Sequence, residues 1–270
     1  MTEFRNKYGD WALVAGAAIG LGESFCVALA KRGINLFMID NREEQLMNLS
    51  GKLTKEYGIH TMPFCIDLFQ TDAVEQIMAK TSAIEIRLML YVAAFSQIKK
   101  FRNFTSDDLE HYININISTP LKLVHAFSNR LISKNQSGGI LLMSSLAGLL
   151  GMQYIVPYAA SKAFTWNLAE SLHHELKPFK IEVMACIAGA TATEAYLGTK
   201  PQYGILKPQV QQPEEVAELA LKKLGKRALF IPGFSNRFHY FILMRVLPRK
   251  MASYFANRTM KTMYSENVED

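Results

Sequence analysis

Trp11-Ala-Leu-Val-Ala15-Gly16-Ala-Ala-Ile-Gly20-Leu-Gly22 joins a short apolar run to three spaced glycines and then to an apolar-periodic segment. We interpret residues 11–15 as a buried strand and residues 21–32 as a helix, which Gly33 ends. A glycine-rich turn between a strand and a helix allows backbone N–H groups and the helix N-terminus to hold a pyrophosphate. The stretch therefore predicts a dinucleotide-binding loop that contains Gly16, Ala18, Ile19, Gly20 and Gly22.

Strand and helix patterns continue to alternate along most of the 270 residues. Further strands are expected at residues 35–40, 61–66, 87–92, 140–144, 180–187 and 227–231. This βαβ repetition is typical of an α/β protein whose parallel sheet is covered on both faces. We predict a doubly wound Rossmann fold over residues 1–233, with a mobile lid at residues 194–212 and a C-terminal helical extension at residues 234–270.

Asp40 stands at the end of the second predicted strand. A carboxylate there can accept hydrogen bonds from both adenosine ribose hydroxyls, and its charge repels a 2′-phosphate, which favours NAD. Arg42 follows two residues later and could pair with such a phosphate, so NADP remains an alternative. Asp40 could also cap the helix that follows.

Tyr158 and Lys162 are four residues apart on a predicted helix, and Ser145 lies upstream of them. Residues at this spacing share a helix face, so the Lys162 ammonium should favour the ionised form of the Tyr158 hydroxyl. The pair alone also fits an ordinary exposed helix face. Together with the glycine loop, it indicates carbonyl and alcohol redox chemistry on a nicotinamide cofactor.

Over roughly residues 8–233 the chain resembles the classical short-chain dehydrogenases and reductases. The glycine loop matches at Gly16, Gly20 and Gly22, although Ala15 replaces the usual threonine. The resemblance implies that Asp67 lies near the adenine amino group, where a strand-end cap is the alternative role, and that Ala93 approaches the cofactor. The largest departure is Tyr91-Val-Ala-Ala94, where the family has Asn-Asn-Ala-Gly.

The same resemblance implies the catalytic set Asn116, Ser145, Tyr158 and Lys162, with Ser144 as the structural neighbour of Ser145. Tyr158 would exchange a proton with the substrate oxygen that Ser145 orients. Lys162 would bind the nicotinamide ribose and lower the pKa of Tyr158. Asn116 would support a relaying water, or else be a polar residue at a helix irregularity. Gly189 and Thr193 would face the nicotinamide, but Ala188 replaces the family's proline, so we expect a more flexible loop.

The expected substrate is a hydrophobic ketone or secondary alcohol, such as a 3-oxoacyl or steroid-like compound. This expectation rests on apolar residues in segments that such enzymes place around the carbonyl: Phe95, Leu149, Leu150, Met152, Tyr154 and Tyr196. The same residues would also suit a protein core or an oligomer contact. A catalytically silent nucleotide sensor or scaffold of the same fold is the alternative function.

The net charge of +6 is concentrated near the C-terminus, since residues 219–264 contain ten Lys and Arg and no Asp or Glu. This distribution argues against a general nucleic-acid-binding surface. The three cysteines are widely spaced in apolar runs and indicate neither a disulfide framework nor a metal site. With no apolar signal region or membrane span in the sequence, we expect a cytoplasmic protein, at most peripheral to a membrane.

The extension combines aromatic residues with Arg237, Arg245, Arg249 and Lys250, which fits an amphipathic basic helix. Three roles stay open for residues 234–264: an anionic membrane surface, an acidic carrier or coenzyme A thioester, and a contact within an oligomer. The family resemblance implies a homodimer or homotetramer built on the long helices that begin near Ser106 and Tyr158.

Overall fold

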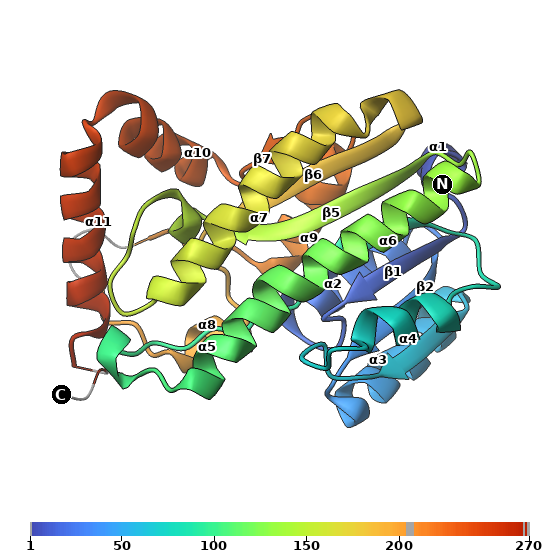
Figure 1. Cartoon of the computed structure of the whole chain (residues 1–270), viewed down its shortest axis with the longest axis horizontal. Helices are drawn as coiled ribbons and strands as arrows, with labels where there is room; N and C mark the ends of the chain where they lie inside the picture. Colours follow the sequence, from blue (N-terminus) through green and yellow to red (C-terminus); the bar gives the residue numbers. More distant parts are fainter. Residues whose placement is uncertain (1, 204–207, 267, 269–270) are drawn as a thin grey trace.

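The computed structural model of the chain, which describes residues 2–203, 208–266 and 268, contains a seven-stranded sheet of order β3-β2-β1-β4-β5-β6-β7 (Figure 1). All neighbouring strands are parallel. The strands are β1 Trp11–Ala15, β2 Asn35–Asp40, β3 Thr61–Cys65, β4 Ile86–Tyr91, β5 Gly138–Ser145, β6 Ile181–Ala188 and β7 Leu229–Phe230. The predicted doubly wound Rossmann sheet is confirmed.

Helices cover both faces of this sheet. The first face is covered by α2 Gly20–Ala30, α3 Glu43–Tyr57 and α9 Pro213–Lys223. The second face is covered by α4 Ala73–Lys80, α6 Thr119–Ser133 and α7 Val156–Glu175. The chain order reverses between β1 and β4, so the carboxyl ends of these two strands form the crevice where such sheets bind ligands.

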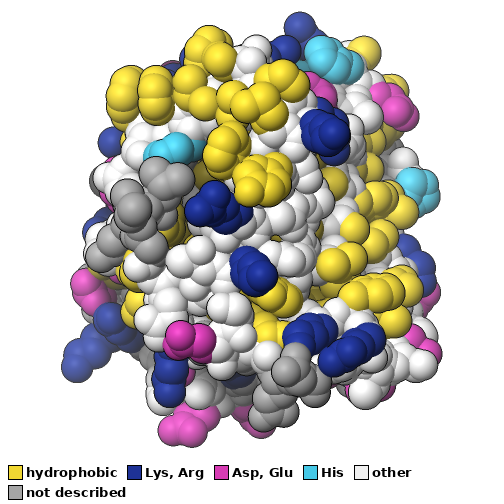
Figure 2. All heavy atoms as spheres, turned by 90° about the vertical axis from the view of Figure 1, so that its left-hand side faces the viewer, with side chains coloured by type: hydrophobic (Ala, Val, Ile, Leu, Met, Phe, Trp, Pro, Cys, Tyr) yellow, Lys and Arg dark blue, Asp and Glu magenta, His cyan; other side chains and the backbone are white. Residues whose placement is uncertain are grey.

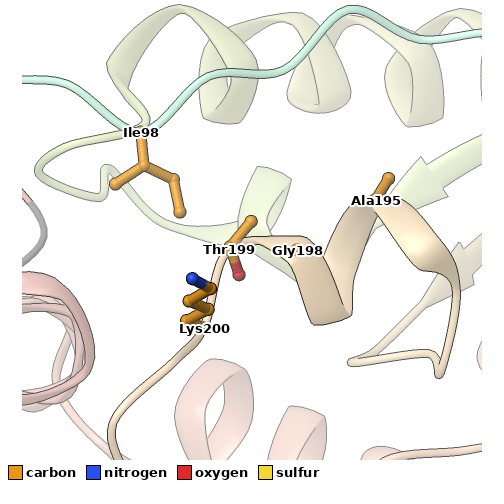
Figure 3. A pocket seen from close by; sticks show the side chains of 5 residues that line it. All are labelled: Ile98, Ala195, Gly198, Thr199 and Lys200. Atoms are coloured by element: carbon orange, nitrogen blue, oxygen red, sulfur yellow. The ribbon is translucent and has the colours of Figure 1, made fainter.

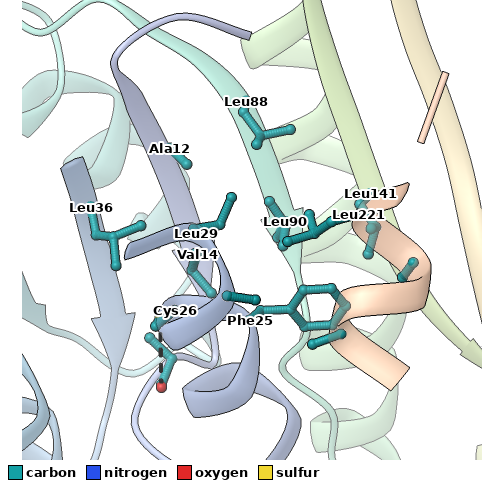
Figure 4. Packing of buried hydrophobic residues seen from close by; sticks show 14 of the residues in the cluster. Ala12, Val14, Phe25, Cys26, Leu29, Leu36, Leu88, Leu90, Leu141 and Leu221 are labelled. Carbon is teal, nitrogen blue, oxygen red and sulfur yellow. Dashed lines mark hydrogen bonds between the residues drawn. The ribbon is translucent and has the colours of Figure 1, made fainter. Parts of the chain in front are cut away.

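Two apolar clusters, one on each face, form the core. On the first face Phe25 and Leu29 of α2 pack against Val14 of β1 and Leu90 of β4, and all four are buried (Figure 4). Cys26 is buried in the same layer, and its thiol donates to the carbonyl of Ala17, with a sulfur–oxygen distance of 4.0 Å. This packing fixes α2 and therefore the glycine loop at its N-terminus.

The long helix expected after Thr105 forms, but with a π-helical segment inside it. It consists of α5 Ser106–Ile113, the π-helical η2 Asn114–Ser118 and then α6. Thr105 and Asp108 make a capping box at its start. Single-turn π-segments are often found at functional sites, and η2 contains the candidate residue Asn116.

Some elements differ from the sequence-based expectations. The helix α1 Thr2–Tyr8 was not predicted. The extension forms two helices instead of one, because Pro248 separates α10 Phe234–Phe241 and the π-helical η5 Ile242–Val246 from α11 Arg249–Tyr264. The predicted lid begins with the short helix α8 Glu194–Gly198, and its residues 204–207 lie outside the described part of the chain.

Candidate active site

The two adjacent serines at the end of β5, Ser144 and Ser145, have different surroundings. Ser144 is buried, and its hydroxyl donates to the carbonyl oxygen of Lys162 at 2.7 Å, which ties β5 to α7. Ser145 is only half-buried, and its hydroxyl is hydrogen-bonded to Tyr158. It also accepts from the backbone N–H of Ala147 at 3.2 Å. Ser145, as expected, is therefore the serine that faces Tyr158.

Lys162 lies on the same face of α7 as Tyr158 but is more deeply buried. Its Nζ is 5.5 Å from the centre of the Tyr158 ring and donates to the carbonyl oxygen of Met143 at 3.0 Å. Burial lowers the pKa of Lys162 to about 8, because the charged form loses hydration. The predicted proximity of Tyr158 and Lys162 is confirmed.

The pKa of Tyr158 moves against the expectation. Burial raises the pKa of its hydroxyl, and the hydrogen bond with Ser145 acts in the lowering direction. The Lys162 ammonium lies over the ring and bonds to Met143. We therefore correct the expected effect of Lys162, because in this arrangement desolvation outweighs any stabilisation of the phenolate.

Asn116 occupies the π-helical segment η2 and connects three parts of the site. Its amide nitrogen donates to the carbonyl of Phe95 at 2.9 Å and to the hydroxyl of Ser161 at 3.1 Å. Its amide oxygen accepts from the Phe95 N–H at 2.8 Å. Asn116 therefore lies at a helix irregularity, as the alternative role expected, and it joins the residue before Lys162 to the loop after β4.

The glycine loop has the backbone geometry of a phosphate cradle. Gly16 and Gly20 have φ of 82° and 61°, a region that favours glycine. A Cβ on Gly16 would lie 2.5 Å from the backbone nitrogen of Ala93, and one on Gly22 would lie 1.7 Å from the carbonyl oxygen of Gly16. These approaches leave no room for side chains. The loop and the N-terminus of α2 fit a dinucleotide pyrophosphate.

Asp40 is buried at the end of β2 and faces this loop. One carboxylate oxygen accepts from the backbone N–H of Ala18 at 3.0 Å. The other accepts from the backbone N–H of Arg42 at 3.1 Å, and the Arg42 guanidinium lies 3.4 Å from it. Asp40 thus fixes the turn after β2, but it does not cap α3, because the N-cap residue of that helix is Arg42 and no side chain caps it. The alternative role as a helix cap is therefore wrong, and the Asp40 carboxylate lies beside the glycine loop.

The other residues predicted to bind the cofactor also lie at the carboxyl ends of the strands. Asp67 accepts from the backbone N–H of Phe69 at 2.9 Å, which is a local turn contact. The N–H of Ala93 donates to the carbonyl of Ala15 at 2.9 Å. Thr193 caps α8 and contacts Gly20, since a Cβ there would lie 3.2 Å from its methyl group. Gly189 lies on the loop that joins β6 to Thr193.

The divergent segment Tyr91 to Ala94 is held by a contact that its sequence did not predict. The Tyr91 hydroxyl donates to the carbonyl of Ile115, in η2, at 2.6 Å. Tyr91 is buried, and burial raises the pKa of its hydroxyl, so the group stays a donor. The tyrosine therefore fixes β4 to the π-helical segment that carries Asn116.

The C-terminal helix α11 packs against Tyr158. A small apolar cluster contains Ile155, Met260, Met263 and Tyr264, and Tyr158 packs against it together with Met152 and Tyr154. The Tyr264 hydroxyl lies 3.2 Å from the hydroxyl of Thr199. The extension therefore packs against Tyr158, a contact that no sequence motif indicated.

The other apolar residues expected around the substrate lie in two places, a buried cluster beside α11 and the helix α8. Leu149 and Leu150 are buried against α11, as core residues would be. Tyr196 is hydrogen-bonded to Tyr203 and belongs to α8. Near it lies a pocket of about 560 Å³ lined by Ile98, Ala195, Gly198, Thr199 and Lys200. In Figure 3, Ile98 on the loop after β4 faces Thr199 and Lys200.

Sequence reasoning missed two buried amides near this edge, Gln211 and Asn236. Gln211 forms an isolated parallel bridge with Thr191, and Asn236 of α10 donates to its side chain. No motif identified either residue. Among the residues that the structure describes, no group of three or more His, Cys, Asp or Glu could hold a metal ion. Within the same residues, no helix is long and apolar enough to cross a membrane.

Comparison with known proteins agrees with this geometry. The family model for short chain dehydrogenases matches residues 10–203. The 7beta-hydroxysteroid dehydrogenase of Collinsella aerofaciens is 31% identical over 236 residues, covering 86% of this chain and 89% of that protein. The very-long-chain 3-oxoacyl-CoA reductase of Rattus norvegicus is 26% identical, covering 81% and 70%. A solved 7beta-hydroxysteroid dehydrogenase structure superposes with a TM-score of 0.85 at 29% identity, covering 94% and 98%.

Proposed function

Because the chain belongs to the short chain dehydrogenase family and is an oxidoreductase of that family, we propose that it interconverts a hydrophobic ketone and its secondary alcohol. The observation that carries this proposal is the contact of Tyr158 with Ser145 beneath the apolar wall of α11. A bound nicotinamide dinucleotide would supply or accept the hydride.

The four catalytic residues have distinct tasks in this proposal. Tyr158 donates a proton to the carbonyl oxygen, or takes it back from the alcohol, and Ser145 orients that oxygen through its hydroxyl. Lys162 binds the ribose hydroxyls next to the nicotinamide. Asn116 holds the loop after β4 and supports a water that exchanges protons with Lys162.

For the substrate we propose a steroid-like or long-chain 3-oxoacyl ketone. Tyr158 belongs to an apolar cluster with the flexible side chains of Met152, Met260 and Met263, which favour a bulky apolar body. Relatives that share most of this chain's length carry the names 7beta-hydroxysteroid dehydrogenase and very-long-chain 3-oxoacyl-CoA reductase. Both names describe chemistry on large apolar compounds.

For the cofactor we propose NAD, with Asp40 as the selecting residue. Its carboxylate is buried at the end of β2 and is fixed by the N–H groups of Ala18 and Arg42, so its negative charge stays beside the adenosine ribose. A 2′-phosphate would be repelled there. The guanidinium of Arg42 is half-exposed and is the group through which NADP would bind instead.

Steady-state turnover with a panel of steroid and 3-oxoacyl ketones, each assayed with NADH and NADPH, tests these proposals together. We expect reduction of at least one bulky ketone and a higher kcat/KM with NADH. Dinucleotide binding without turnover of any ketone would favour the nucleotide sensor. A higher kcat/KM with NADPH would assign cofactor choice to Arg42.

For the extension we propose contact with an anionic membrane surface. Phe234, Phe238 and Phe241 are spaced to share one face of α10, and their exposed fractions are 77%, 54% and 54%. Figure 2 shows hydrophobic side chains gathered at the upper edge of the face that carries α11, with Lys and Arg nearby. Exposed aromatic side chains beside cations are typical of helices that lie on anionic lipids.

The charge of the same surface disfavours its use between copies of the chain. A two-fold interface brings one patch against itself, so Arg237, Arg245 and Arg249 would face like charges with no acidic residue in the segment. Self-association is better supported on the long helices, which expose Ile113 on α5, Leu121 on α6 and Val156 on α7. We propose a homodimer or homotetramer through that face.

A further inference from the structure

The loop after β6 has Ala188 where its family has a proline. Gln211, which is distant in the sequence, holds this loop by backbone hydrogen bonds. The N–H of Gln211 donates to the carbonyl of Ala190 at 2.9 Å, and the N–H of Ala192 donates to the carbonyl of Gln211 at 2.9 Å. These two bonds make a strand-like bridge between Thr191 and Gln211. The loop is therefore fixed from outside rather than by its own sequence.

Asn236 of α10 holds Gln211 in turn. The two side chains have exposed fractions of 6% and 3%, and the Asn236 amide donates to the Gln211 amide oxygen at 2.7 Å. Asn236 also donates to the carbonyl of Pro232 at 3.1 Å. Because an unpaired buried amide is costly, this pair has one strongly preferred arrangement.

The Asn236 amide also lies directly against the loop. A Cβ on Gly189 would be 2.6 Å from its nitrogen and 2.7 Å from its oxygen, so only glycine fits at that position. At the other end of the loop, Thr193 contacts Gly20 of the glycine loop. A continuous set of contacts thus joins α10 to the edge of the sheet where the dinucleotide loop lies.

We infer that Asn236 and Gln211 are positioning residues that hold residues 189–193 against the nicotinamide half of the dinucleotide. They supply the rigidity that a proline at residue 188 would otherwise give. This role rests on the proposed function, since it concerns the cofactor of the same site. It also makes the first helix of the extension part of the cofactor site, although α10 has no motif for nucleotide binding.

Binding of NADH and of ADP to the full chain, measured by calorimetry, tests this role. ADP reports the adenosine half alone, so a general loss of stability would affect both ligands. In Asn236→Ala we expect NADH to bind about tenfold more weakly, as for the loss of a buried hydrogen bond, while ADP binding is unchanged. Amide hydrogen exchange at Ala192 and Gln211 should become faster in the same variant.

Two further variants complete the test. Gln211→Met keeps the side-chain volume but removes the acceptor, so it should repeat the selective loss even if Asn236→Ala folds poorly. Asn35→Ala is the control, because the Asn35 side chain is likewise hydrogen-bonded to the backbone, accepting from the N–H of His60, but at the opposite end of β2 from the site. It should leave both ligands unaffected.

Different results would overturn the positioning role of Asn236 and Gln211 and the proposed oxidoreductase function. Equal weakening of NADH and ADP in Asn236→Ala and Gln211→Met, or unchanged NADH binding in both, would overturn the positioning role alone. A wild-type protein that binds neither NADH nor NADPH would overturn the proposed function and this role with it.

Discussion

At the scale of single residues, burial sets the charges of the catalytic pair. It lowers the pKa of Lys162 to about 8 and raises that of Tyr158, in spite of the hydrogen bond with Ser145. Near neutral pH, Tyr158 therefore keeps its proton and most Lys162 side chains stay charged. This combination suits the proton donation to a carbonyl oxygen that we propose for Tyr158.

The pH dependence of ketone reduction should follow the charge of Lys162. As pH rises through about 8, Lys162 loses its proton and can no longer act as a cation, so kcat/KM should be constant below this value and fall above it. In Lys162→Arg the guanidinium stays charged, and the fall near pH 8 should disappear. Initial rates across the pH range measure this, and a fall that persists in Lys162→Arg would assign it to another group.

Removal of the Tyr158 hydroxyl should separate chemistry from binding. Tyr158→Phe keeps the ring against the α11 cluster but removes the proton donor, so turnover should fall by at least about 100-fold, the usual contribution of general acid catalysis. Dinucleotide affinity, measured by calorimetry, should stay unchanged. Undiminished turnover in this variant would remove Tyr158 from the proposed mechanism.

At the scale of elements, the π-helical segment η2 organises the site. It places Asn116 between Phe95 and Ser161, and its Ile115 carbonyl accepts from Tyr91 of β4. A strand that departs from its family's sequence is thus fixed to the helical segment that carries Asn116. The contact is long-range in the chain, so the departure looked like a loss when only the sequence was considered.

The Tyr91 hydroxyl should contribute measurably to this arrangement. Tyr91→Phe leaves the buried carbonyl of Ile115 without its donor, so the free energy of unfolding should fall by about 1–3 kcal/mol. Urea denaturation measures the change. The exposed Tyr254 gives a matched control, because Tyr254→Phe should change stability by less than about 0.5 kcal/mol. Equal stability of the two variants would contradict a structural role for Tyr91.

At the scale of the whole molecule, the C-terminal extension has an inner side that packs on the candidate site and an outer side that is exposed. Its inner side packs on Tyr158 through Met260 and Met263, and Asn236 reaches the loop after β6. Its outer side exposes aromatic and basic residues. The extension could thus bring the substrate opening close to an apolar phase in which a bulky ketone would be dissolved.

Vesicle flotation with the full chain tests the outer side. The protein should float with vesicles that contain phosphatidylglycerol, less so with phosphatidylcholine alone, and salt should weaken the binding. Combined substitution of Phe234, Phe238 and Phe241 by Ser should abolish flotation, because it removes the apolar face of α10. The control carries Phe101→Ser and Phe179→Ser, which are exposed elsewhere.

Two results would contradict the membrane proposal. The first is flotation that survives the three serine substitutions on α10. The second is a halved molecular mass in the same variant by analytical ultracentrifugation, which would assign the surface to contact between copies of the chain.

The sequence by itself determined the sheet, the glycine loop and the proximity of Tyr158 and Lys162. These features are local: strand and helix periods, glycines that must adopt positive φ, and an i to i+4 spacing are all properties of short segments. The positions of Asp40 and Ser145 at one edge of the sheet could be predicted for the same reason. Each residue ends a strand whose direction the βαβ pattern fixes.

Only the tertiary structure decided the rest. The Tyr91 contact with Ile115, the bond between Asn236 and Gln211, and the cover that Met260 gives Tyr158 join segments far apart in the chain. The pKa of Tyr158 also depends on tertiary structure, because burial of the hydroxyl raises it. Burial and long-range pairing come from the packing of the whole chain, and no short segment encodes them.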